Sequence, residues 1–193
     1  MPSSSSGLAL LVIDMQEHFR KMGEPIVPEL NDTIRSCRDL GIPIFFTQHG
    51  HKYLDLDGGV LANWFGKENM IKYGSAAWEL MPELDVNEEW DVRLVSKRRY
   101  DAFYGTALAD MLHQLEVHTV IISGVMTNLC CETTARSAFV RDFDVLFLSD
   151  GTATENEEMH KATLTNIAYG FGKVLSCKEL RDMVKEKTAN KKK

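Results

Sequence analysis

The sequence predicts an α/β protein, a three-layer α/β/α sandwich around a mostly parallel, doubly wound sheet of about six strands. Short apolar runs that are rich in β-branched or aromatic residues alternate with longer segments of helical periodicity. The chain has 193 residues, which fits one domain with a sizeable core. Hydrophobic residues make up 44% and charged residues 26%, the ordinary balance of a globular protein.

The candidate strands are bounded by turn or polar residues, as is typical of strands buried on both faces. Between them, apolar residues recur at helical spacing, and Gly41 ends the first such stretch. Strand alternating with helix implies right-handed crossovers, which place helices on both faces of the sheet. The expected strands span 8–13, 42–46, 92–95, 120–122, 145–148 and 173–176, and the expected helices span 30–40, 107–115, 128–141, 157–168 and 178–187.

The segment 48–90 breaks this rhythm, because its glycines and tryptophans alternate with charges and show no sustained period. We interpret it as a long loop with short helices over the active site. Loops of this length are usually functional, often as lids or substrate walls, and a surface excursion or subunit contact is the alternative. The single domain is expected to span 1–193, with flexible ends at 1–7 and 188–193.

Charge and composition argue against several classes of partner. The formal net charge of -6 disfavours nucleic acid or an anionic membrane. No apolar run approaches the ~20 residues that a membrane-spanning helix requires, and the first residues do not resemble a secretory signal. The four cysteines lack zinc-type spacing and are expected to be reduced thiols. We therefore expect a cytoplasmic protein that acts on a small molecule.

Three chemically active residues follow three of the predicted strands. Asp14 follows 8–13, Lys97 follows the strand that begins at 92, and Cys130 lies in the turn after 120–122. Because ligands bind outside the carboxyl ends of parallel strands, an acid, a cation and a thiol are expected to meet at one rim. Each has a structural alternative, such as a helix cap for Asp14 or core packing for a cysteine. Their joint placement indicates a catalytic site.

The two adjacent cysteines have to be distinguished. If the helix begins near Thr127 or Asn128, Cys131 shares a small apolar stripe with Ala135 and is buried. Cys130 then lies about 100° round the helix, in the first turn. Unpaired N–H groups and the positive end of the helix dipole gather in that turn and are expected to lower the pKa of a thiol. Cys130 is therefore the predicted nucleophile.

Three segments resemble the motifs of one family, the isochorismatase-like cysteine hydrolases. The stretch 123–136, SGVMTNLCCETTAR, resembles their nucleophile segment, and Asp14-Met15-Gln16 resembles their first-strand aspartate motif. The stretch 97–106, KRRYDAFYGT, resembles their lysine segment. The strings GVMTNLCCETTAR and FFTQHGH in particular resemble plant-type nicotinamidases and their unassigned relatives. Family members form dimers and tetramers, so the resemblance implies a homodimer or homotetramer.

The resemblance also implies a mechanism. Asp14 takes the proton from Cys130, Lys97 pairs with both, and the thiolate attacks a carbonyl carbon to form a thioester. A cis peptide between Val125 and Met126 is implied, with the N–H groups of Met126 and Cys130 as the oxyanion hole. The leading hypothesis is hydrolysis of the C–N bond of a small planar amide, with nicotinamide as the named case.

Other functions stay open at this point. Isochorismate hydrolysis is one alternative, but family members that catalyse it need no thiol, so Cys130 favours the amidase. A non-catalytic homologue that acts through an interface is another, against which the intact set of Asp14, Lys97 and Cys130 argues. Dinucleotide binding is poorly supported, because no GxGxxG turn follows the first strand.

The residues expected to bind the substrate have flat rings. Each of the four aromatic residues among them has core packing as its alternative. The predicted set is Phe19, His49, Trp64, Phe103 and Tyr104.

A metal site is not expected. Metal-binding nicotinamidases carry Asp-x-His after the second strand and another histidine downstream. This chain has His49-Gly50-His51 there and no further histidine until His113. We therefore expect no cofactor and no metal, and a divalent ion at His49 and His51 is the minority alternative.

Overall fold

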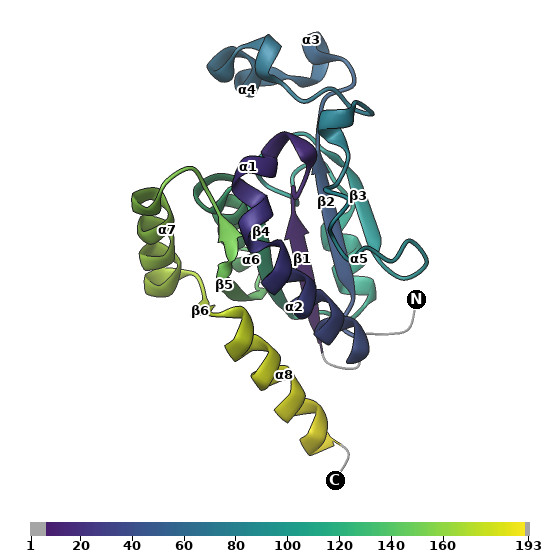
Figure 1. The fold of residues 1–193 in the computed structure, drawn as a ribbon, viewed down its shortest axis with the longest axis vertical. Helices are drawn as coiled ribbons and strands as arrows, with labels where there is room; N and C mark the ends of the chain where they lie inside the picture. Colours follow the sequence, from purple (N-terminus) through teal and green to yellow (C-terminus); the bar gives the residue numbers. More distant parts are fainter. Residues whose placement is uncertain (1–6, 192–193) are drawn as a thin grey trace.

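The computed structural model describes residues 7–191, with the side chains of residues 7–186, and the six strands of this part of the chain form one sheet. The strand order is β3-β2-β1-β4-β5-β6, and every neighbouring pair is parallel. The predicted doubly wound sheet is thus confirmed (Figure 1). The strands are β1 (Leu8–Ile13), β2 (Ile44–His49), β3 (Val92–Lys97), β4 (Thr119–Val125), β5 (Asp144–Ala153) and β6 (Lys173–Leu175).

Helices cover both faces of the sheet. The main helices are α2 (Val27–Asp39), α5 (Leu108–Gln114), α6 (Glu132–Phe139), α7 (Glu157–Gly170) and α8 (Cys177–Lys191). The short elements are α1 (Arg20–Gly23), α3 (Leu54–Asp57), α4 (Gly59–Phe65), η1 (Glu17–Phe19), η2 (Glu24–Ile26), η3 (Lys67–Asn69), η4 (Ala76–Trp78) and η5 (Thr127–Cys131).

The hydrophobic core has two halves, one on each face of the sheet. Successive side chains of a strand point to opposite faces, so Leu10 of β1 packs into one half and Leu11 into the other. The Leu10 half contains apolar residues of α2 and α8, such as Ile34 and Leu180. The Leu11 half contains residues of α5, α6 and α7, such as Leu112. These two halves make the α/β/α sandwich.

The structure corrects several predicted helix bounds. Helix α2 begins at Val27 rather than at residue 30, with proline in its first turn, where a missing N–H costs nothing. The helix predicted over 128–141 is divided into the π-helical turn η5 and helix α6. The terminal helix α8 runs from Cys177 to Lys191, beyond the predicted 178–187. The turns between residues 17 and 26 were not predicted, because they are too short to show a period.

The segment between β2 and β3 carries α3 and α4, which stand clear of the sheet in Figure 1. Asp57, at the end of α3, anchors it. Its carboxylate accepts from the backbone N–H of Lys52 at 2.9 Å and from Nε of Arg98 at 3.1 Å, and lies 3.2 Å from Nδ1 of His51. Because Arg98 directly follows Lys97, the anchor joins this segment to the carboxyl end of β3.

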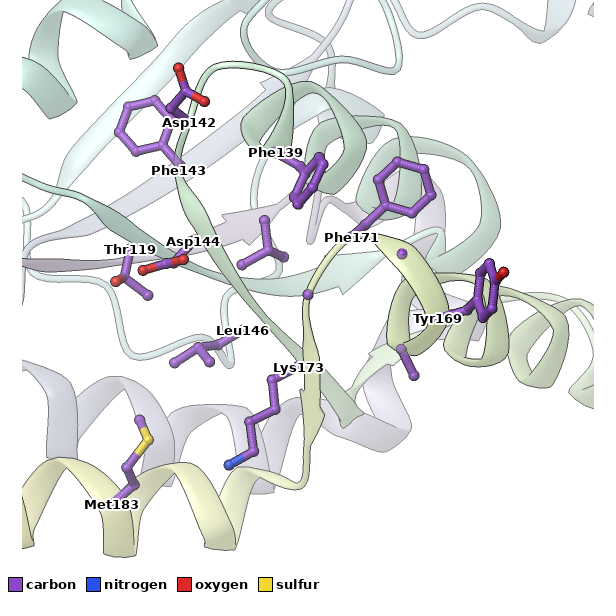
Figure 2. Close-up of a pocket in the computed structure, with 14 residues that line it drawn as sticks. Thr119, Phe139, Asp142, Phe143, Asp144, Leu146, Tyr169, Phe171, Lys173 and Met183 are labelled. Carbon is purple, nitrogen blue, oxygen red and sulfur yellow. The ribbon is translucent and has the colours of Figure 1, made fainter.

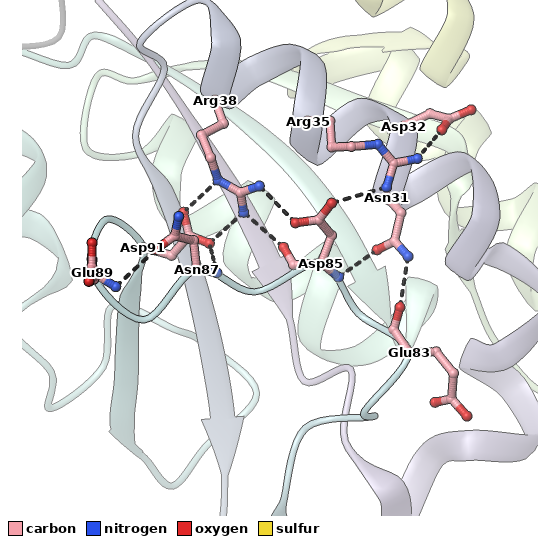
Figure 3. A network of polar contacts seen from close by, with 9 residues as sticks. All are labelled: Asn31, Asp32, Arg35, Arg38, Glu83, Asp85, Asn87, Glu89 and Asp91. Carbon is pink, nitrogen blue, oxygen red and sulfur yellow. Dashed lines mark hydrogen bonds and ion pairs between the residues drawn. The ribbon is translucent and has the colours of Figure 1, made fainter.

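The loop over residues 83–91, which leads into β3, is bound to α2 by the polar network in Figure 3. Arg38 donates to Asp85 Oδ1 at 2.8 Å and to Asp91 Oδ2 at 2.7 Å. Asn31 donates to the carbonyl of Glu83 at 2.8 Å and accepts from the N–H of Asp85 at 2.9 Å. These contacts fix the loop from which the third strand starts.

The predicted flexible ends fall largely outside the described residues, which exclude 1–6 and 192–193. Gly7 is buried and its carbonyl accepts from the N–H groups of His118 and Thr119. Residues 188–191 belong to α8. Within the described part of the chain, no helix has the length and apolar character needed to span a bilayer.

Candidate active site

The carboxyl ends of the central strands bring the predicted acid, lysine and thiol together. Asp14 follows β1, Lys97 is the last residue of β3, and Cys130 lies in η5, which follows β4. Lys97 Nζ lies 2.5 Å from Asp14 Oδ2, and neither side chain is exposed. The Cys130 thiol is also buried and interacts with both charged groups. The predicted convergence of these three residues is therefore present in the structure.

Thr47 of β2 holds the Asp14 carboxylate in place. Its hydroxyl donates to Asp14 Oδ1 at 2.6 Å and accepts from the backbone N–H of Asp14 at 3.1 Å. Asp14 has a φ of 49°, a left-handed conformation that costs free energy for a residue other than glycine. Thr47 was not predicted as a site residue, although its position at the end of an apolar strand was a signal.

The turn that carries Cys130 begins with a cis peptide bond between Val125 and Met126, the bond that the family resemblance implies. The carbonyl of Met126 then accepts from the N–H groups of Leu129 and Cys131, each at 3.1 Å. Cys130 faces the cavity. The Cys131 thiol instead points toward the carbonyl of Ser123, at 3.8 Å, inside the core. The two cysteines are thus separated as the sequence predicted.

The resting thiol differs from the predicted one. Burial raises the pKa of Cys130 to about 12, and Lys97 opposes this rise only in part. The prediction that the start of the helix lowers the pKa of this thiol is therefore wrong, because burial outweighs the neighbouring positive charge. Burial would lower the pKa of Lys97, but Asp14 and Cys130 raise it above its ordinary value. Lys97 is therefore protonated, whereas Cys130 is an un-ionised thiol. The thiol needs a base to remove its proton if it is to act as a nucleophile.

Helix α7 and the loop before it contact the nucleophile turn, which is η5, and the start of α6. Thr127 Oγ1 lies 3.0 Å from Nδ1 of His160, and Thr163 Oγ1 donates to Glu132 Oε2 at 2.7 Å. Asn128, within the turn, accepts from the Thr154 hydroxyl at 2.6 Å. No role was predicted for His160, since its contact with Thr127 spans 33 positions of the chain.

His49 lines the cavity beside this group, and the buried side chain of Gln16 holds its backbone in place. Gln16 Nε2 donates to the carbonyls of His49 and Trp78 at 3.0 and 2.7 Å, and its Oε1 accepts from the N–H of His49 at 2.8 Å. Burial and, to a smaller degree, Lys97 lower the pKa of His49 to about 3. His49 is therefore a neutral imidazole at the cavity wall at neutral pH.

The residues around His49 do not fit a metal with three protein ligands. Nδ1 of His49 and Nε2 of His51 are buried and lack a hydrogen-bond partner, and the two rings are 5.0 Å apart. The other ring nitrogen of His51, Nδ1, is paired with Asp57. Within residues 7–191, no three His, Cys, Asp or Glu side chains are grouped so that they can hold an ion. Two imidazole nitrogens alone are a poor zinc site.

A cavity of about 410 Å³ opens in front of Cys130. Its walls are mostly apolar, with aromatic, aliphatic and methionine side chains. The segment between β2 and β3 contributes a large part of these walls. The lining residues are His18, Phe19, Met22, His49, Leu61, Phe65, Asn69, Met70, Ile71, Tyr100, Met126, Asn128, Leu129, Cys130, Glu155 and Met159.

Only two of the five predicted substrate-binding residues, Phe19 and His49, lie in this wall. Phe103 is buried in the core, with its ring stacked on Phe143 at 5.9 Å. Tyr104 is 64% exposed and lines a shallower hollow, and Trp64 is 80% exposed. Trp64, Phe103 and Tyr104 are therefore not wall residues of this cavity, contrary to the prediction. The sequence alone does not show which way an aromatic ring points. Phe65 and Tyr100 are the aromatic rings that line the cavity instead.

A larger hollow of about 720 Å³ lies at the other end of the sheet (Figure 2). It is lined by the starts of β5 and β6, including Asp144 and Lys173, together with Tyr169 and Phe171. None of the predicted site residues lines it. Ligands of doubly wound folds bind at the carboxyl ends of the strands, so the Cys130 cavity is the candidate active site.

A doubly wound fold with a buried acid, lysine and thiol at its carboxyl rim is characteristic of α/β cysteine hydrolases. The family model described as isochorismatase domain matches residues 8–179. Nicotinamidase 3 of Arabidopsis thaliana is 46% identical over 173 residues, which cover 90% of this chain and 86% of the relative. The chain therefore belongs to the isochorismatase family, and it is a hydrolase that acts on small molecules.

One further relative agrees with this family, and one solved structure shares the fold. A ureidoacrylate amidohydrolase of Yersinia enterocolitica is 31% identical over 199 residues, which cover 89% of this chain and 85% of the relative. A cysteine hydrolase of Pseudomonas syringae pv. phaseolicola has the same fold, with a TM-score of 0.88 at 24% identity over 96% of this chain and 98% of that one.

Proposed function

We propose that this protein hydrolyses the C–N bond of a small, planar, uncharged carboxamide, with nicotinamide as the leading candidate. The observation that carries the proposal is the buried Asp14, Lys97 and Cys130 group at one end of an apolar cavity. A cavity of about 410 Å³ with aromatic walls suits a single flat ring. The 46% identity to a plant nicotinamidase supports the same substrate class.

In the proposed mechanism, Asp14 removes the proton of Cys130 as sulfur attacks the carbonyl carbon. The N–H groups of Met126 and Cys130 stabilise the oxyanion, and protonated Lys97 stabilises the charge on Asp14 and sulfur. The proton passes from Asp14 to the leaving nitrogen, so ammonia departs and a thioester remains. Asp14 then activates water, which breaks the thioester, releases the carboxylic acid and restores the thiol.

Ammonia and pyruvate release, measured side by side, test the proposal. The panel contains nicotinamide, pyrazinamide, ureido compounds and isochorismate. Ammonia from the aromatic amides is expected, and hydroxylamine should divert part of the acyl group to a hydroxamate because it is a better nucleophile than water. Pyruvate release that persists in Cys130→Ala would identify an ether hydrolase instead. If neither ammonia nor pyruvate is released from any compound of the panel, the non-catalytic alternative is favoured.

We propose that turnover needs no metal. Within the described residues, no third His, Cys, Asp or Glu side chain is grouped with His49 and His51 to hold an ion, which supports this proposal. Protein purified without added metal and then dialysed against a strong chelator is expected to keep its activity. Stoichiometric zinc or iron, with activity restored only by that metal, would contradict it.

We also propose that the protein is a cytoplasmic homodimer or homotetramer. The exposed apolar residues Leu56, Val60 and Trp64 of α3 and α4 support an assembly, since apolar surface of this kind is typical of an interface. The four free cysteines fit a reducing compartment. Light scattering would give the mass of the assembly, and cell fractionation would give the compartment. A monomer mass or a secreted protein would contradict the respective proposal.

A further inference from the structure

The walls of the Cys130 cavity carry one uncompensated charge. Glu155 is the only aspartate or glutamate among its described lining residues. Burial lowers the pKa values of His18 and His49, so both imidazoles are neutral. No lysine or arginine lines the cavity.

The position of Glu155 is set by its two neighbours. Thr154 donates its hydroxyl proton to Asn128 in the nucleophile turn at 2.6 Å. Asn156 caps α7 by accepting from the N–H of Met159 at 2.9 Å. The loop that bears Glu155 is thereby tied to the nucleophile turn and to the first turn of α7. Glu155 itself is exposed, and no ion pair joins it to a cation in the described part of the chain.

The catalytic group does not cancel this charge. Lys97 is the cation nearest the chemistry, but it is ion-paired with Asp14 at 2.5 Å. That pair has no net charge, and the thiol of Cys130 is un-ionised because burial raises its pKa. A bound anion therefore meets the negative charge of Glu155 without a free positive charge in the cavity wall.

The proposed reaction changes the charge of the bound molecule. A neutral carboxamide and water become a carboxylate anion and an ammonium ion. We propose that Glu155 is a specificity-determining residue, whose charge disfavours substrates that carry a carboxylate and weakens the binding of the carboxylate product. This inference rests on the proposed amidase function. Under this proposal, a residue outside the catalytic group determines whether the enzyme accepts neutral or anionic substrates.

The proposal predicts a selectivity that depends on salt. Two like charges across a solvated cavity repel each other by an amount that corresponds to about three- to tenfold in affinity at low ionic strength. Solvent ions screen that repulsion, so the effect should shrink in concentrated salt. A purely steric role for Glu155 would not depend on salt.

The test compares Glu155→Gln with Glu158→Gln, which removes a nearby exposed glutamate that does not line the cavity. In Glu155→Gln at low salt, the inhibition constant for nicotinate should fall about three- to tenfold relative to the KM for nicotinamide. This difference should largely disappear in ~0.5 M NaCl. Glu158→Gln should keep the wild-type ratio. Glu155→Lys should lower the ratio of the nicotinate inhibition constant to the nicotinamide KM further than Glu155→Gln does. It should also raise the rate on ureidoacrylate, an anionic amide, relative to the rate on nicotinamide.

The outcomes separate the two proposals. Wild-type turnover with an unchanged nicotinate-to-nicotinamide ratio in Glu155→Gln would overturn the role of Glu155 and leave the amidase function intact. An equal change in Glu158→Gln, or a change that salt does not reduce, would also overturn it. If the wild type neither releases ammonia from any amide nor binds nicotinate by calorimetry, both proposals fail.

Discussion

Cys130, Asp14 and Lys97 show how burial changes the chemistry of individual residues. An exposed thiol is partly ionised near neutral pH and needs little help to react. The buried thiol of Cys130 has a pKa of about 12, so it must lose its proton during the attack itself. A carboxylate held against a protonated lysine is suited to receive that proton and to pass it to the leaving nitrogen.

Replacement of the two cysteines should have unequal effects. Cys130→Ala removes the nucleophile and should reduce kcat by about 10⁴-fold or more. Cys131→Ala removes a core thiol and should lower stability by about 1–2 kcal/mol while the mechanism stays intact. Steady-state kinetics and peptide mapping after alkylation measure both effects. Preferential labelling of Cys131, with activity lost in parallel, would reject Cys130 as the nucleophile.

Thr47 is expected to act on catalysis through Asp14. Thr47→Val keeps the shape but removes the hydroxyl, and losing a hydrogen bond to a charged group costs about 1.5–3 kcal/mol. We therefore expect kcat to fall about 10- to 100-fold, with a smaller change in KM. Thr47→Ser keeps the hydroxyl and should retain most of the activity. Equal kinetics in the two variants would show that the hydroxyl does not position Asp14.

At the scale of secondary-structure elements, loops determine where the strand ends meet. The loop 83–91 is fastened to α2 by Arg38, whose partner Asp91 is almost fully buried. A broken pair would leave the Asp91 carboxylate without its guanidinium partner, which is more costly than the loss of an exposed pair. The network therefore stabilises the approach to β3 and, with it, the position of Lys97.

Two arginine variants of α2 test this network. Arg38→Ala should lower the free energy of unfolding by about 2–3 kcal/mol. Arg35→Ala breaks half-exposed ion pairs with Asp32 and Asp85, and should cost less than about 1 kcal/mol. Urea titration at a fixed protein concentration measures both values. If both variants lose the same free energy of unfolding, the buried ion pair between Arg38 and Asp91 does not stabilise the protein more than the exposed pairs do.

For the molecule as a whole, the exposed apolar residues of α3 and α4 are the proposed interface between subunits. The segment over residues 53–65 supplies Leu61 and Phe65 to the cavity, and it also exposes Leu56, Val60 and Trp64. A partner subunit that covers these exposed residues would hold the cavity wall in place. Assembly and activity are therefore expected to be coupled.

Trp64→Glu should dissociate the assembly, because a charge in an apolar interface is costly to bury. Light scattering should report a smaller mass, and KM should rise as the wall loosens. Tyr169→Glu is the matched control, since Tyr169 is an exposed ring beside the larger hollow. Dissociation by Tyr169→Glu with an intact Trp64→Glu assembly would place the interface at that hollow.

The sequence by itself determined the class of fold and the three central residues. Strand and helix periods are local properties, and the alternation of the two implies a parallel sheet whose carboxyl ends share one rim. Asp14, Lys97 and Cys130 stand directly at or after such ends, so their meeting followed from topology. The motif resemblance added the cis bond between Val125 and Met126, which the structure contains.

Only the tertiary structure decided the surroundings of these residues. Thr47 lies 33 positions from Asp14, and His160 lies 33 positions from Thr127, so no local pattern links them. The pKa of Cys130 depends on burial by several elements at once. The direction of each ring in 48–90 also depends on packing between elements. A period reports which residues share a face, whereas burial and side-chain direction depend on what the fold brings against that face.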